Sequence, residues 1–376
     1  MRIAVNTRFL IPGKMEGFGY FIEEVFLRMA SQHPEHEFYF LFDRPAATSF
    51  LFPPNVKCIV TGPQARHPLL WMLWYNLQIP RILRTIKADV FVSPDGFCSL
   101  TTSVPQCVVI HDIAFAHYPD FITKSHLWFY RRYTPLFVKK AKVIATVSEY
   151  SKEDLRKQYH VDPAKIRVIY SATNPIFQPV DWEKREAIKL ELTSGTEYFL
   201  YTGTVHPRKN LIGLLKAFSK FKKMQKSNMK LVLVGRMTWK NETFKQLLQT
   251  FRFKDDVILT GYVSKEKLAE ITAAAYALIY PSFFEGFGVP PLEALQCHVP
   301  AIVSEVSALP EIGGDAYLYI NPNQVNDIAE KMMRLYKDES LREKLISNGK
   351  RQLQLYSWQR TADLLWDAIL QTTQQG

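Results

Sequence analysis

Two glutamates eight positions apart, Glu285 and Glu293, flank a glycine-bracketed segment with the sequence EGFGVPPLE. The two adjacent prolines suit the first turn of a helix, which places Glu285 in the preceding loop and Glu293 in or near that turn. The positive end of a helix favours ionised carboxylates, so we expect both side chains to accept hydrogen bonds from hydroxyl groups. A capped helix with two surface glutamates is the alternative that the spacing leaves open.

Gly286 and Gly288 lie between these glutamates and allow backbone amides to approach a ligand closely. The N-terminus of the following helix attracts phosphate groups. Carboxylates for hydroxyl groups and amides for a phosphate together indicate a polyol phosphate as the ligand.

A second cluster, GTVHPRKN at residues 203–210, follows one expected strand and opens an expected helix. Asn210 is a good N-cap, and Arg208 and Lys209 project from the loop beside the first helix amides. Two cations at such a place can stabilise a departing nucleoside diphosphate without a metal ion. The segment is not a P-loop, because the GxxxxGK[ST] pattern is absent. A pair of exposed basic residues without function is the alternative.

His111 and Asp112 follow the expected strand QCVVI. The carboxyl end of a parallel strand is where ligands bind, although a histidine satisfied inside the core is the alternative. The tetrapeptide EGFG also occurs at residues 16–19, where Glu16 and Glu24 repeat the same glutamate spacing. The prolines and the strand context differ in that copy, so we interpret its spacing as a coincidence on an acceptor-side loop and helix.

The sequence pattern predicts short strands that alternate with helices, and these elements must position the residues above. Two of the expected helices are residues 18–31 and 127–140. This alternation implies parallel sheets with crossover helices, and so an α/β, doubly wound domain in each half. The expected strands are RIAVN, EFYFLF, VKCIV, DVFVS, QCVVIHD and KVIATVS in the first half, and EYFLYTG, KLVLVG, DVILTG, YALIYPS and PAIVSE in the second.

Pro175 and Pro179 interrupt regular structure between the halves, so we place the domain boundary near Pro179. The expected domains are residues 1–178 and 179–356. A helix at residues 357–376, capped by Ser357, is expected to pack back across the domains. Because ligands gather at the carboxyl ends of parallel strands, the two domains are expected to face a central cleft that holds the site.

The chain has 376 residues, a net charge of +11 and four cysteines without metal-ligand or disulfide spacing. The length fits two domains, and the charge suits an anionic partner. Nucleic acid is not expected, because no zinc-finger or RNA-binding motif is present. The cysteine pattern predicts ordinary buried thiols in a reducing compartment and no metal site. The sequence shows neither a signal peptide nor a membrane span, which predicts a cytoplasmic protein.

Two stretches, HPLLWMLWYNLQIPRILR and SHLWFYRRYTPLFVKKAK, combine aromatic and basic residues. They suit peripheral docking on an anionic bilayer, such as the inner face of the plasma membrane, or binding of a lipid-linked acceptor. Ordinary helices that cover a sheet explain them equally well.

In its motifs and their order the sequence resembles the retaining glycosyltransferases of the GT-B fold, family 4 or group 1, in the mannosyltransferase-like branch of lipopolysaccharide O-antigen synthesis. The resemblance spans nearly the whole chain, and Glu285 to Glu293 matches the E-x7-E motif of the family. The other matching segments are GTVHPRKN, LVGRMTWKNE, LTGYVSKEKLAEITAAAYALIYPSFFEGFGVPPLEAL and SALPEIGGDA.

The resemblance implies two Rossmann-like domains and transfer of a hexose from a nucleotide sugar to a glycan or lipid-linked acceptor. Mannose from GDP-mannose is one candidate donor. It also implies retention of the anomeric configuration and no metal or other cofactor. Glu285 would hold hydroxyls of the donor hexose and Glu293 the nucleotide ribose. Lys209, helped by Arg208, would neutralise the leaving diphosphate, and His111 would lie near the reacting sugar.

The resemblance further implies that a loop at Gly17 to Gly19 approaches the diphosphate and the acceptor. The chain departs from the family pattern at Tyr20, Ser171, Thr204 and His298; family members often have glycine in place of His298. The donor-binding residues expected besides those above are Gly17, Gly19, Thr204, Arg236, Gly286, Phe287, Gly288 and Val289.

Two other functions fit the same residues. A GT-B epimerase acting on a UDP-N-acetylhexosamine would turn over its substrate without an acceptor. A non-catalytic protein would only bind a nucleotide sugar or another polyanion. Lys209 and Glu285 argue against this last function, because a binding protein has no leaving group to stabilise.

Overall fold

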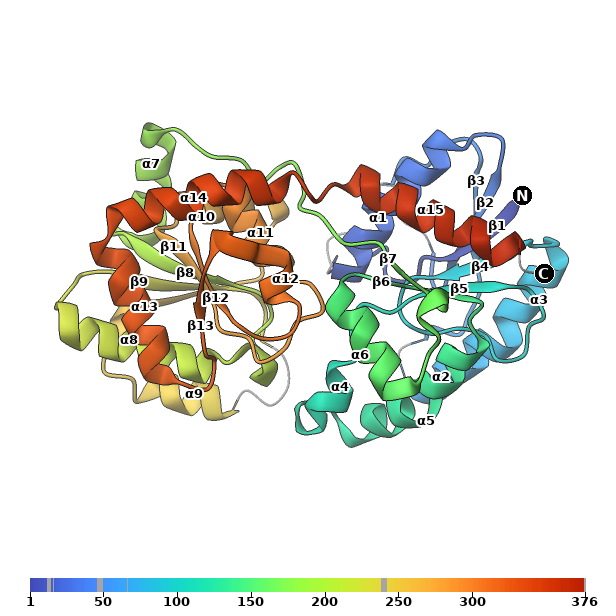
Figure 1. Cartoon of the computed structure of the whole chain (residues 1–376), viewed down its shortest axis with the longest axis horizontal. Coiled ribbons are helices and arrows are strands. Elements are labelled where there is room, and N and C mark those ends of the chain that lie inside the picture. Colours follow the sequence, from blue (N-terminus) through green and yellow to red (C-terminus); the bar gives the residue numbers. More distant parts are fainter. Residues whose placement is uncertain (12–14, 16, 46–49, 66, 238–241, 375–376) are drawn as a thin grey trace. The chain divides into compact units, whose positions relative to one another are not determined.

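The computed structural model describes residues 1–11, 15, 17–45, 50–65, 67–237 and 242–374. Contacts divide the chain into two compact units. The N-terminal unit comprises Met1–Ser171 and Ser357–Gly376, and the C-terminal unit comprises Ala172–Tyr356. Each unit is built on one parallel β-sheet with helices packed against it (Figure 1).

The sheet of the N-terminal unit has the strand order β3-β2-β1-β4-β5-β6-β7, and every neighbouring pair is parallel. Its central strands are continuous apolar runs that are buried throughout, as expected where both faces of a sheet are covered. The strands are β1 Arg2–Asn6, β2 Glu37–Phe42, β3 Val56–Val60, β4 Val90–Ser93, β5 Gln106–Val109, β6 Val143–Thr146 and β7 Ile166–Val168.

Helices of the N-terminal unit connect these strands, and one further helix, α15 (Trp358–Gln374), comes from the end of the chain. A continuous helical segment runs through α2 (Pro68–Leu73), a π-helical turn η1 (Trp74–Gln78) and α3 (Ile79–Thr85). The other helices are α1 Gly17–Gln32, α4 Ala114–His117, α5 Lys124–Lys140 and α6 Glu149–Tyr159, with short 3-10 turns η2 Pro119–Phe121 and η3 Pro163–Lys165.

The sheet of the C-terminal unit has the order β10-β9-β8-β11-β12-β13, again with parallel neighbours. Its strands are β8 Tyr198–Thr202, β9 Lys230–Val234, β10 Val257–Gly261, β11 Ala277–Tyr280, β12 Ala301–Ser304 and β13 Tyr317–Ile320. Its helices are α7 Trp182–Thr193, α8 Leu211–Gln225, α9 Glu242–Gln249, α10 Lys265–Ala274, α11 Val289–Gln296, α12 Leu309–Gly313, α13 Val325–Lys337 and α14 Glu339–Leu353, with 3-10 turns η4 Pro207–Lys209, η5 Lys254–Asp256 and η6 Gly314–Ala316.

Every strand expected from the sequence is present, and the prediction of two doubly wound α/β domains is confirmed. The sequence reading missed β7 and β13, which form one edge of each sheet. β7 has only three residues, which show too little of a strand pattern to be recognised, whereas β13 has four, as several recognised strands do.

The chain passes from one unit to the other at Ala172, before the expected boundary at Pro179. The physical reason is that residues between Ala172 and Pro179 already form hydrogen bonds within the C-terminal unit. The Thr173 hydroxyl donates to the side chain of Gln296, whose amide donates to the carbonyl of Asn174 at 3.3 Å.

Helix α15 packs within the N-terminal unit, against α1 and strands β4 to β7. Trp366 stacks on His33 with 3.8 Å between ring centroids, and Arg167 donates to Gln371 at 2.7 Å. Ser357 caps the helix by accepting from the Arg360 amide at 3.1 Å.

Among the described helices, none combines the length and the apolar character needed to cross a bilayer. Three cysteines are buried, as expected, but Cys58 is exposed. Cys58 lies on β3, an edge strand that other elements cover only in part.

Candidate active site

Lys209 and Glu285 form an ion pair in the C-terminal unit, with 2.5 Å between Nζ and Oε1. Lys209 ends the turn η4 that follows β8, and Glu285 follows β11, the neighbouring strand. The two side chains are only 11% and 8% exposed. The Lys209 ammonium also donates to the Tyr280 hydroxyl at 2.7 Å. The tertiary structure thus joins two motifs that lie 76 residues apart in sequence.

Arg208 lies beside this pair and ties its two loops together. Its guanidinium donates to the Phe284 carbonyl at 2.8 Å and lies 3.6 Å from Glu285 Oε2. Burial alone would raise the pKa of Glu285, but the charges of Lys209 and Arg208 outweigh it and lower this pKa. Glu285 is therefore an ionised acceptor held between two cations.

Glu293 has a different electrostatic environment, although it belongs to the same motif. It lies on α11 beyond the first turn, and burial raises its pKa to about 8, with only the charge of Lys265 opposing. The expectation that the helix N-terminus keeps Glu293 ionised is wrong. The helix dipole acts mainly within its first turn, so the loss of hydration dominates at this position.

The loop between the two glutamates is shaped by its glycines. Gly288 precedes α11 with a φ of 96°, and a Cβ added there would lie 2.5 Å from a methyl carbon of Leu309. The Phe287 ring is buried and packs edge-on against Tyr356 at 5.5 Å. Phe287 therefore anchors the loop with its side chain, which leaves its backbone as the part suited to a ligand. Gly286 is buried, and Val289 is partly exposed as the first residue of α11.

Thr204 and Arg236 lie on adjacent loops after β8 and β9. The Val205 amide donates to the Arg236 carbonyl at 3.0 Å, and the Tyr201 hydroxyl donates to the Thr204 carbonyl at 3.1 Å. The Arg236 side chain is exposed. Arg236, one of the expected donor-binding residues, thus lies at the same end of the sheet as the Lys209 turn.

In the N-terminal unit, His111 follows β5 and is held in one orientation. Its Nε2 lies 3.0 Å from the Pro94 carbonyl, which can only accept, so Nε2 carries the proton and Nδ1 is the acceptor. Phe18 and Phe21 contact the ring edge-on at 4.8 and 5.0 Å. Burial lowers the pKa of His111, so the ring is neutral at pH 7 and suits a sugar hydroxyl better than a phosphate.

A loop was expected at Gly17 and Gly19, but both glycines lie in the first turn of α1. A Cβ on Gly19 would lie 2.7 Å from the Phe9 carbonyl oxygen, so close packing against the preceding segment explains this glycine. A Cβ on Gly17 would meet nothing within 4 Å. Glu16 lies outside the described residues, and Glu24 pairs with Arg28 along α1 at 2.7 Å.

The sequence reading missed a buried ion pair between the turns that follow β1 and β4. Arg8 and Asp95 lie 2.7 Å apart with side chains 4% and 1% exposed. Arg8 is the second residue after β1, so its place just after a strand was the available signal. The contacts of Asp95 fix the turn after β4. The Pro94 carbonyl in that turn orients His111. Asn6, Tyr75 and Ser93 also donate to Asp95.

One further contact of Glu285 involves a residue outside its own loop. The Glu285 amide donates to the hydroxyl of Ser307, the first residue of the segment SALPEIGGDA, at 2.9 Å. In the described part of the chain, no group of three or more His, Cys, Asp or Glu side chains could hold a metal ion.

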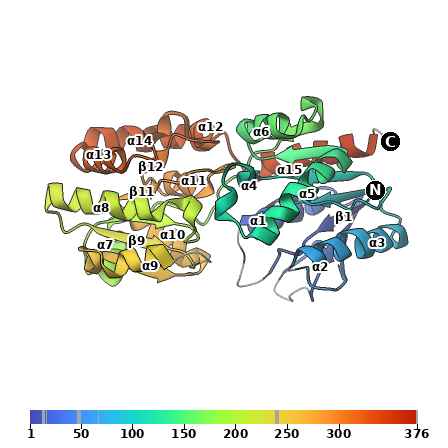
Figure 2. The same ribbon diagram turned by 90° about the horizontal axis from the view of Figure 1, so that it is seen from below.

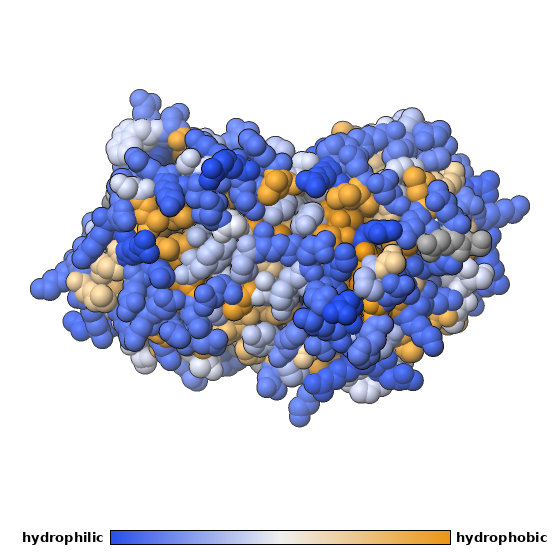
Figure 3. Space-filling view, in the orientation of Figure 1, coloured by the Kyte–Doolittle hydropathy of each residue, from blue (hydrophilic) through white to orange (hydrophobic). Residues whose placement is uncertain are grey.

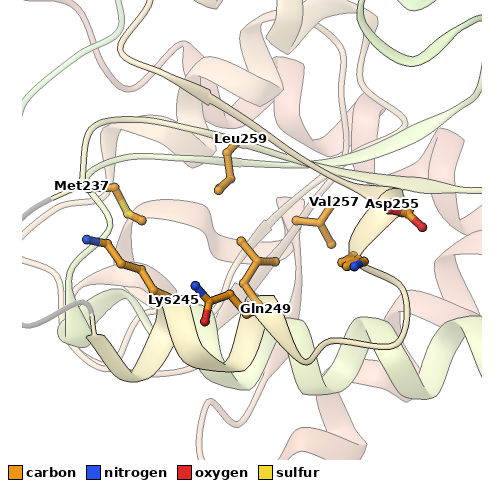
Figure 4. A pocket seen from close by; sticks show the side chains of 8 residues that line it. Met237, Lys245, Gln249, Asp255, Val257 and Leu259 are labelled. Atoms are coloured by element: carbon orange, nitrogen blue, oxygen red, sulfur yellow. The ribbon is translucent and has the colours of Figure 1, made fainter.

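A surface pocket of about 490 Å³ lies elsewhere in the C-terminal unit, between α9 and the edge strand β10 (Figure 4). Met237, Leu248 and Leu259 contribute apolar walls, and Lys245 contributes an ammonium group. None of its lining residues belongs to the site predicted from the sequence.

Comparisons with known proteins show the family to which the chain belongs. A family model described as "Glycosyl transferases group 1" matches residues 183–352, and one described as "Glycosyltransferase Family 4" matches residues 22–175. The chain is 31% identical over 300 residues to the O-antigen chain mannosyltransferase B of Escherichia coli, covering 78% of each chain. It is 32% identical over 275 residues to the O-antigen chain mannosyltransferase RfbU of Salmonella typhimurium, covering 72% of this chain and 71% of that one.

Among solved structures, the sucrose-phosphate synthase of Thermosynechococcus elongatus superposes with a TM-score of 0.80 at 19% identity, covering 100% of both chains. At this identity the likeness concerns the fold. Together with the family models and the mannosyltransferase relatives, it shows that the chain belongs to the group 1, family 4 glycosyltransferases of the GT-B fold.

Proposed function

We propose that this glycosyltransferase moves a mannosyl residue from GDP-mannose to a glycan or lipid-linked acceptor in O-antigen synthesis, with retention of configuration and without a metal ion. The names of the two O-antigen mannosyltransferase relatives support the sugar and the pathway. The observation that carries the chemistry is the Lys209–Glu285 ion pair with Arg208 beside it.

In the proposed reaction, the bond between the sugar anomeric carbon and the diphosphate oxygen breaks. The acceptor oxygen bonds to the same face of that carbon, and the acceptor proton passes to the leaving phosphate oxygen. Negative charge grows on the diphosphate, where Lys209 and Arg208 would stabilise it. Because Glu285 and Tyr280 already hold the Lys209 ammonium, little ordering of that side chain remains to be done during the reaction.

The other residues divide between the two substrates. Glu285 would accept hydrogen bonds from donor hydroxyls, and the amides before α11 would bind phosphate. Glu293 would bind the ribose. Nδ1 of neutral His111 would accept a hydrogen bond from the transferred sugar.

The test is transfer by Lys209→Ala and Glu285→Gln variants. We expect kcat/KM to fall by about 10² or more in each, since removal of one preorganised charge partner has effects of this size. Lys223→Ala and Glu330→Ala change exposed residues of the same unit and serve as matched controls. Thermal unfolding of each variant separates a catalytic loss from a folding loss.

Near-normal turnover in both site variants would contradict the assigned roles. Activity that EDTA abolishes would contradict the metal-free reaction, and turnover of a UDP-N-acetylhexosamine without an acceptor would indicate an epimerase. A thermal-shift comparison of GDP, UDP and dTDP sugars identifies the base, because the ligand that binds raises the melting temperature.

We also propose peripheral contact with an anionic bilayer through the helical segment α2–η1–α3 and helix α5. Figure 3 shows a largely hydrophilic surface interrupted by hydrophobic patches. Leu69, Leu73 and Leu77 recur every fourth residue along α2 and η1 and are 45% to 68% exposed. Trp128 on α5 is 59% exposed. The two helices pack together through Trp71 and Phe129, whose ring centroids lie 5.0 Å apart.

Charge supports this contact. Residues 67–88 contain three lysine or arginine residues and residues 124–142 contain six, and neither segment has an acidic residue, in a chain whose net charge is +11. Basic groups beside exposed apolar side chains are what an anionic interface attracts.

Sedimentation with phosphatidylglycerol vesicles tests the bilayer contact. The wild-type protein is expected to pellet with these vesicles and to be released by salt, because screening weakens the attraction. Leu73→Ser combined with Leu77→Ser should reduce pelleting, whereas Leu190→Ser, which changes an exposed leucine of the other unit, should not. Equal pelleting of all three proteins would contradict the proposed surface.

A further inference from the structure

The ion pair of the candidate site adjoins a buried tyrosine hydroxyl that no motif singled out. Tyr280 is the last residue of β11 and is 1% exposed. Its hydroxyl accepts a hydrogen bond from the Lys209 ammonium at 2.7 Å, and the same ammonium donates to Glu285 Oε1 at 2.5 Å. The phenol thus lies beside the site where the two charges meet.

The Tyr280 hydroxyl can serve both members of the pair at once. It accepts from Lys209, so its own proton remains for another acceptor. Burial is the main cause that raises the pKa of Tyr280, the charge of Glu285 is the next, and a hydrogen bond with that carboxylate contributes as well. The phenol therefore keeps its proton and can donate it to Glu285.

The sheet and a second aromatic ring hold Tyr280 in place. β11 is an inner strand between β8 and β12, and all of its residues are buried. Figure 2 shows it inside the C-terminal unit, among the helices that cover the sheet. The Tyr201 ring on β8 stacks on Tyr280 with 6.2 Å between centroids and 17° between planes. A ring anchored in this way presents its hydroxyl at a fixed point.

A second hydroxyl near Glu285 lacks a hydrogen bond. Ser282 is the second residue after β11 and is 0% exposed, and its Oγ has no partner in the described part of the chain. Burial raises the pKa of Glu285, whereas Lys209, Arg208 and, to a smaller extent, the Ser282 hydroxyl lower it. Buried hydroxyls are normally hydrogen-bonded, so an unpaired one so close to a carboxylate indicates a role for it.

The proposed reaction needs both charges at fixed positions. The diphosphate, which Lys209 would stabilise, leaves from the same sugar whose hydroxyls Glu285 would accept. A displacement of about 1 Å at such a site can lower the rate about 10²-fold. A rigid hydroxyl that contacts both charges couples their positions to each other.

We propose that Tyr280 and Ser282 are positioning residues, with Tyr280 holding Lys209 and Glu285 at a fixed separation. The Ser282 hydroxyl turns to donate to Glu285 when a hydroxyl of the donor sugar engages that carboxylate. This inference rests on the proposed function and adds to it the two groups that set the geometry of the charges. The competing role is that both side chains only fill the core beside the sheet.

Tyr280→Phe removes the hydroxyl and keeps the ring. We expect kcat/KM for GDP release from GDP-mannose, with octyl glycosides as acceptors, to fall about tenfold, the effect of one lost hydrogen bond to a charged group. GDP should also bind more weakly. In a Lys209→Ala background both losses should be smaller by at least about threefold, because one of the two positioned groups is already gone.

Tyr198→Phe is the matched control for this substitution. Tyr198 is fully buried on β8, and its hydroxyl donates to the Ile271 carbonyl at 2.6 Å. The control loses a buried hydrogen bond of the same sheet, so it can lower the melting temperature, but kcat/KM and GDP binding should stay those of the wild type. A core-filling role predicts instead that Tyr280→Phe has the same effect with and without Lys209.

Ser282→Ala is tested in the same way against Glu285. We expect the KM of GDP-mannose to rise about tenfold and the Kd of GDP to remain unchanged, because GDP lacks the transferred sugar. In a Glu285→Ala background the substitution should change this KM by less than about twofold. Thr272→Val, which removes a buried hydroxyl of α10 that donates to the Leu268 carbonyl at 2.8 Å, is the control.

Equal losses for Tyr280→Phe in the wild-type and Lys209→Ala backgrounds overturn the inference, and so does an unchanged KM in Ser282→Ala. Titration with GDP needs no acceptor, so the cycle of Tyr280 with Lys209 decides the matter even where no octyl glycoside is used. GDP-mannose and GDP give way to another nucleotide sugar and its diphosphate if the thermal-shift comparison selects them. Wild-type protein that neither binds nor turns over any nucleotide sugar would contradict the proposed function itself.

Discussion

Glu285 and Glu293 show how two identical side chains of one motif acquire different properties. Glu285 lies between the cations of Lys209 and Arg208, which lower its pKa despite burial. Burial raises the pKa of Glu293 to about 8, because Lys265 compensates for it only in part. The first glutamate suits donor hydroxyls as a fixed anion. The second is largely protonated at neutral pH until a ligand or a rise in pH changes it.

Glu293→Gln tests this difference through the pH dependence of stability. The carboxyl has a pKa near 4.3 when unfolded and about 8 when folded, so wild-type stability is complete below about pH 4 and declines as the pH rises towards 8. The variant lacks this decline. From pH 5 to pH 8.5 the free energy of unfolding of the variant, relative to that of the wild type, should rise by at least about 1.4 kcal/mol, the value of one pKa unit.

Urea unfolding at the two pH values measures this gain, with exposed Glu330→Gln as the control. A difference between variant and wild type that is the same at both pH values would contradict the raised pKa.

Helix α11 positions this motif, and both of its ends depend on left-handed residues. Gly288 precedes the helix with a φ of 96°, and His298 follows it with a φ of 58°. The Val299 amide donates to the Ala294 carbonyl and the His298 amide to the Leu295 carbonyl, a Schellman motif with His298 at its left-handed position. Glycine is the residue best suited to that conformation, which gives the departure from the family pattern a physical meaning.

His298→Gly should stabilise the protein by about 0.5 to 1 kcal/mol. The free energy released by removing the left-handed strain exceeds the entropic cost of the more flexible unfolded chain. Gly288→Ala should destabilise it by about 2 kcal/mol or more, since it combines strain with a clash against Leu309. Chemical denaturation measures both changes. A stabilising Gly288→Ala, or a destabilising His298→Gly, would contradict the conformations assigned to the two ends of α11.

At the scale of the whole molecule, the two units differ in how the chain builds them. The C-terminal unit is one continuous stretch, Ala172–Tyr356, and contains Lys209, Glu285 and Glu293. The N-terminal unit contains His111 and is completed only by α15, whose Leu365 and Ile369 are fully buried.

Two truncations test this organisation. Residues 172–356 alone should fold and bind the nucleotide sugar more weakly than the full chain, and they should transfer nothing, because His111, the proposed partner of the transferred sugar, is missing. Residues 1–356 should show a lower melting temperature for the N-terminal unit and an unchanged one for the C-terminal unit, because only the former loses buried surface. Calorimetry and titration with GDP-mannose measure both. A single cooperative loss of both units on removal of α15 would contradict the division.

Local patterns were enough to predict the strands, the alternation of strand and helix and the residues after the strands that form the candidate site. Apolar runs such as RIAVN and KLVLVG, and breakers such as the two prolines before Glu293, act within a few residues. For the same reason the two-domain α/β architecture could be predicted, whereas β7 and the crossing at Ala172 could not. An edge strand of three residues carries little pattern, and a boundary depends on which unit the linking residues contact.

Only the tertiary structure decided how those residues act. The order of the strands joined Lys209 to Glu285 across 76 residues, and the fold placed Tyr280 beside Lys209 and Asp95 beside Arg8. It also set the opposite pKa shifts of the two glutamates. Short sequence motifs show which residue types are available for chemistry. Their charge states and partners depend on burial and on neighbours distant in the chain, because hydration and Coulomb interactions are set by position in space.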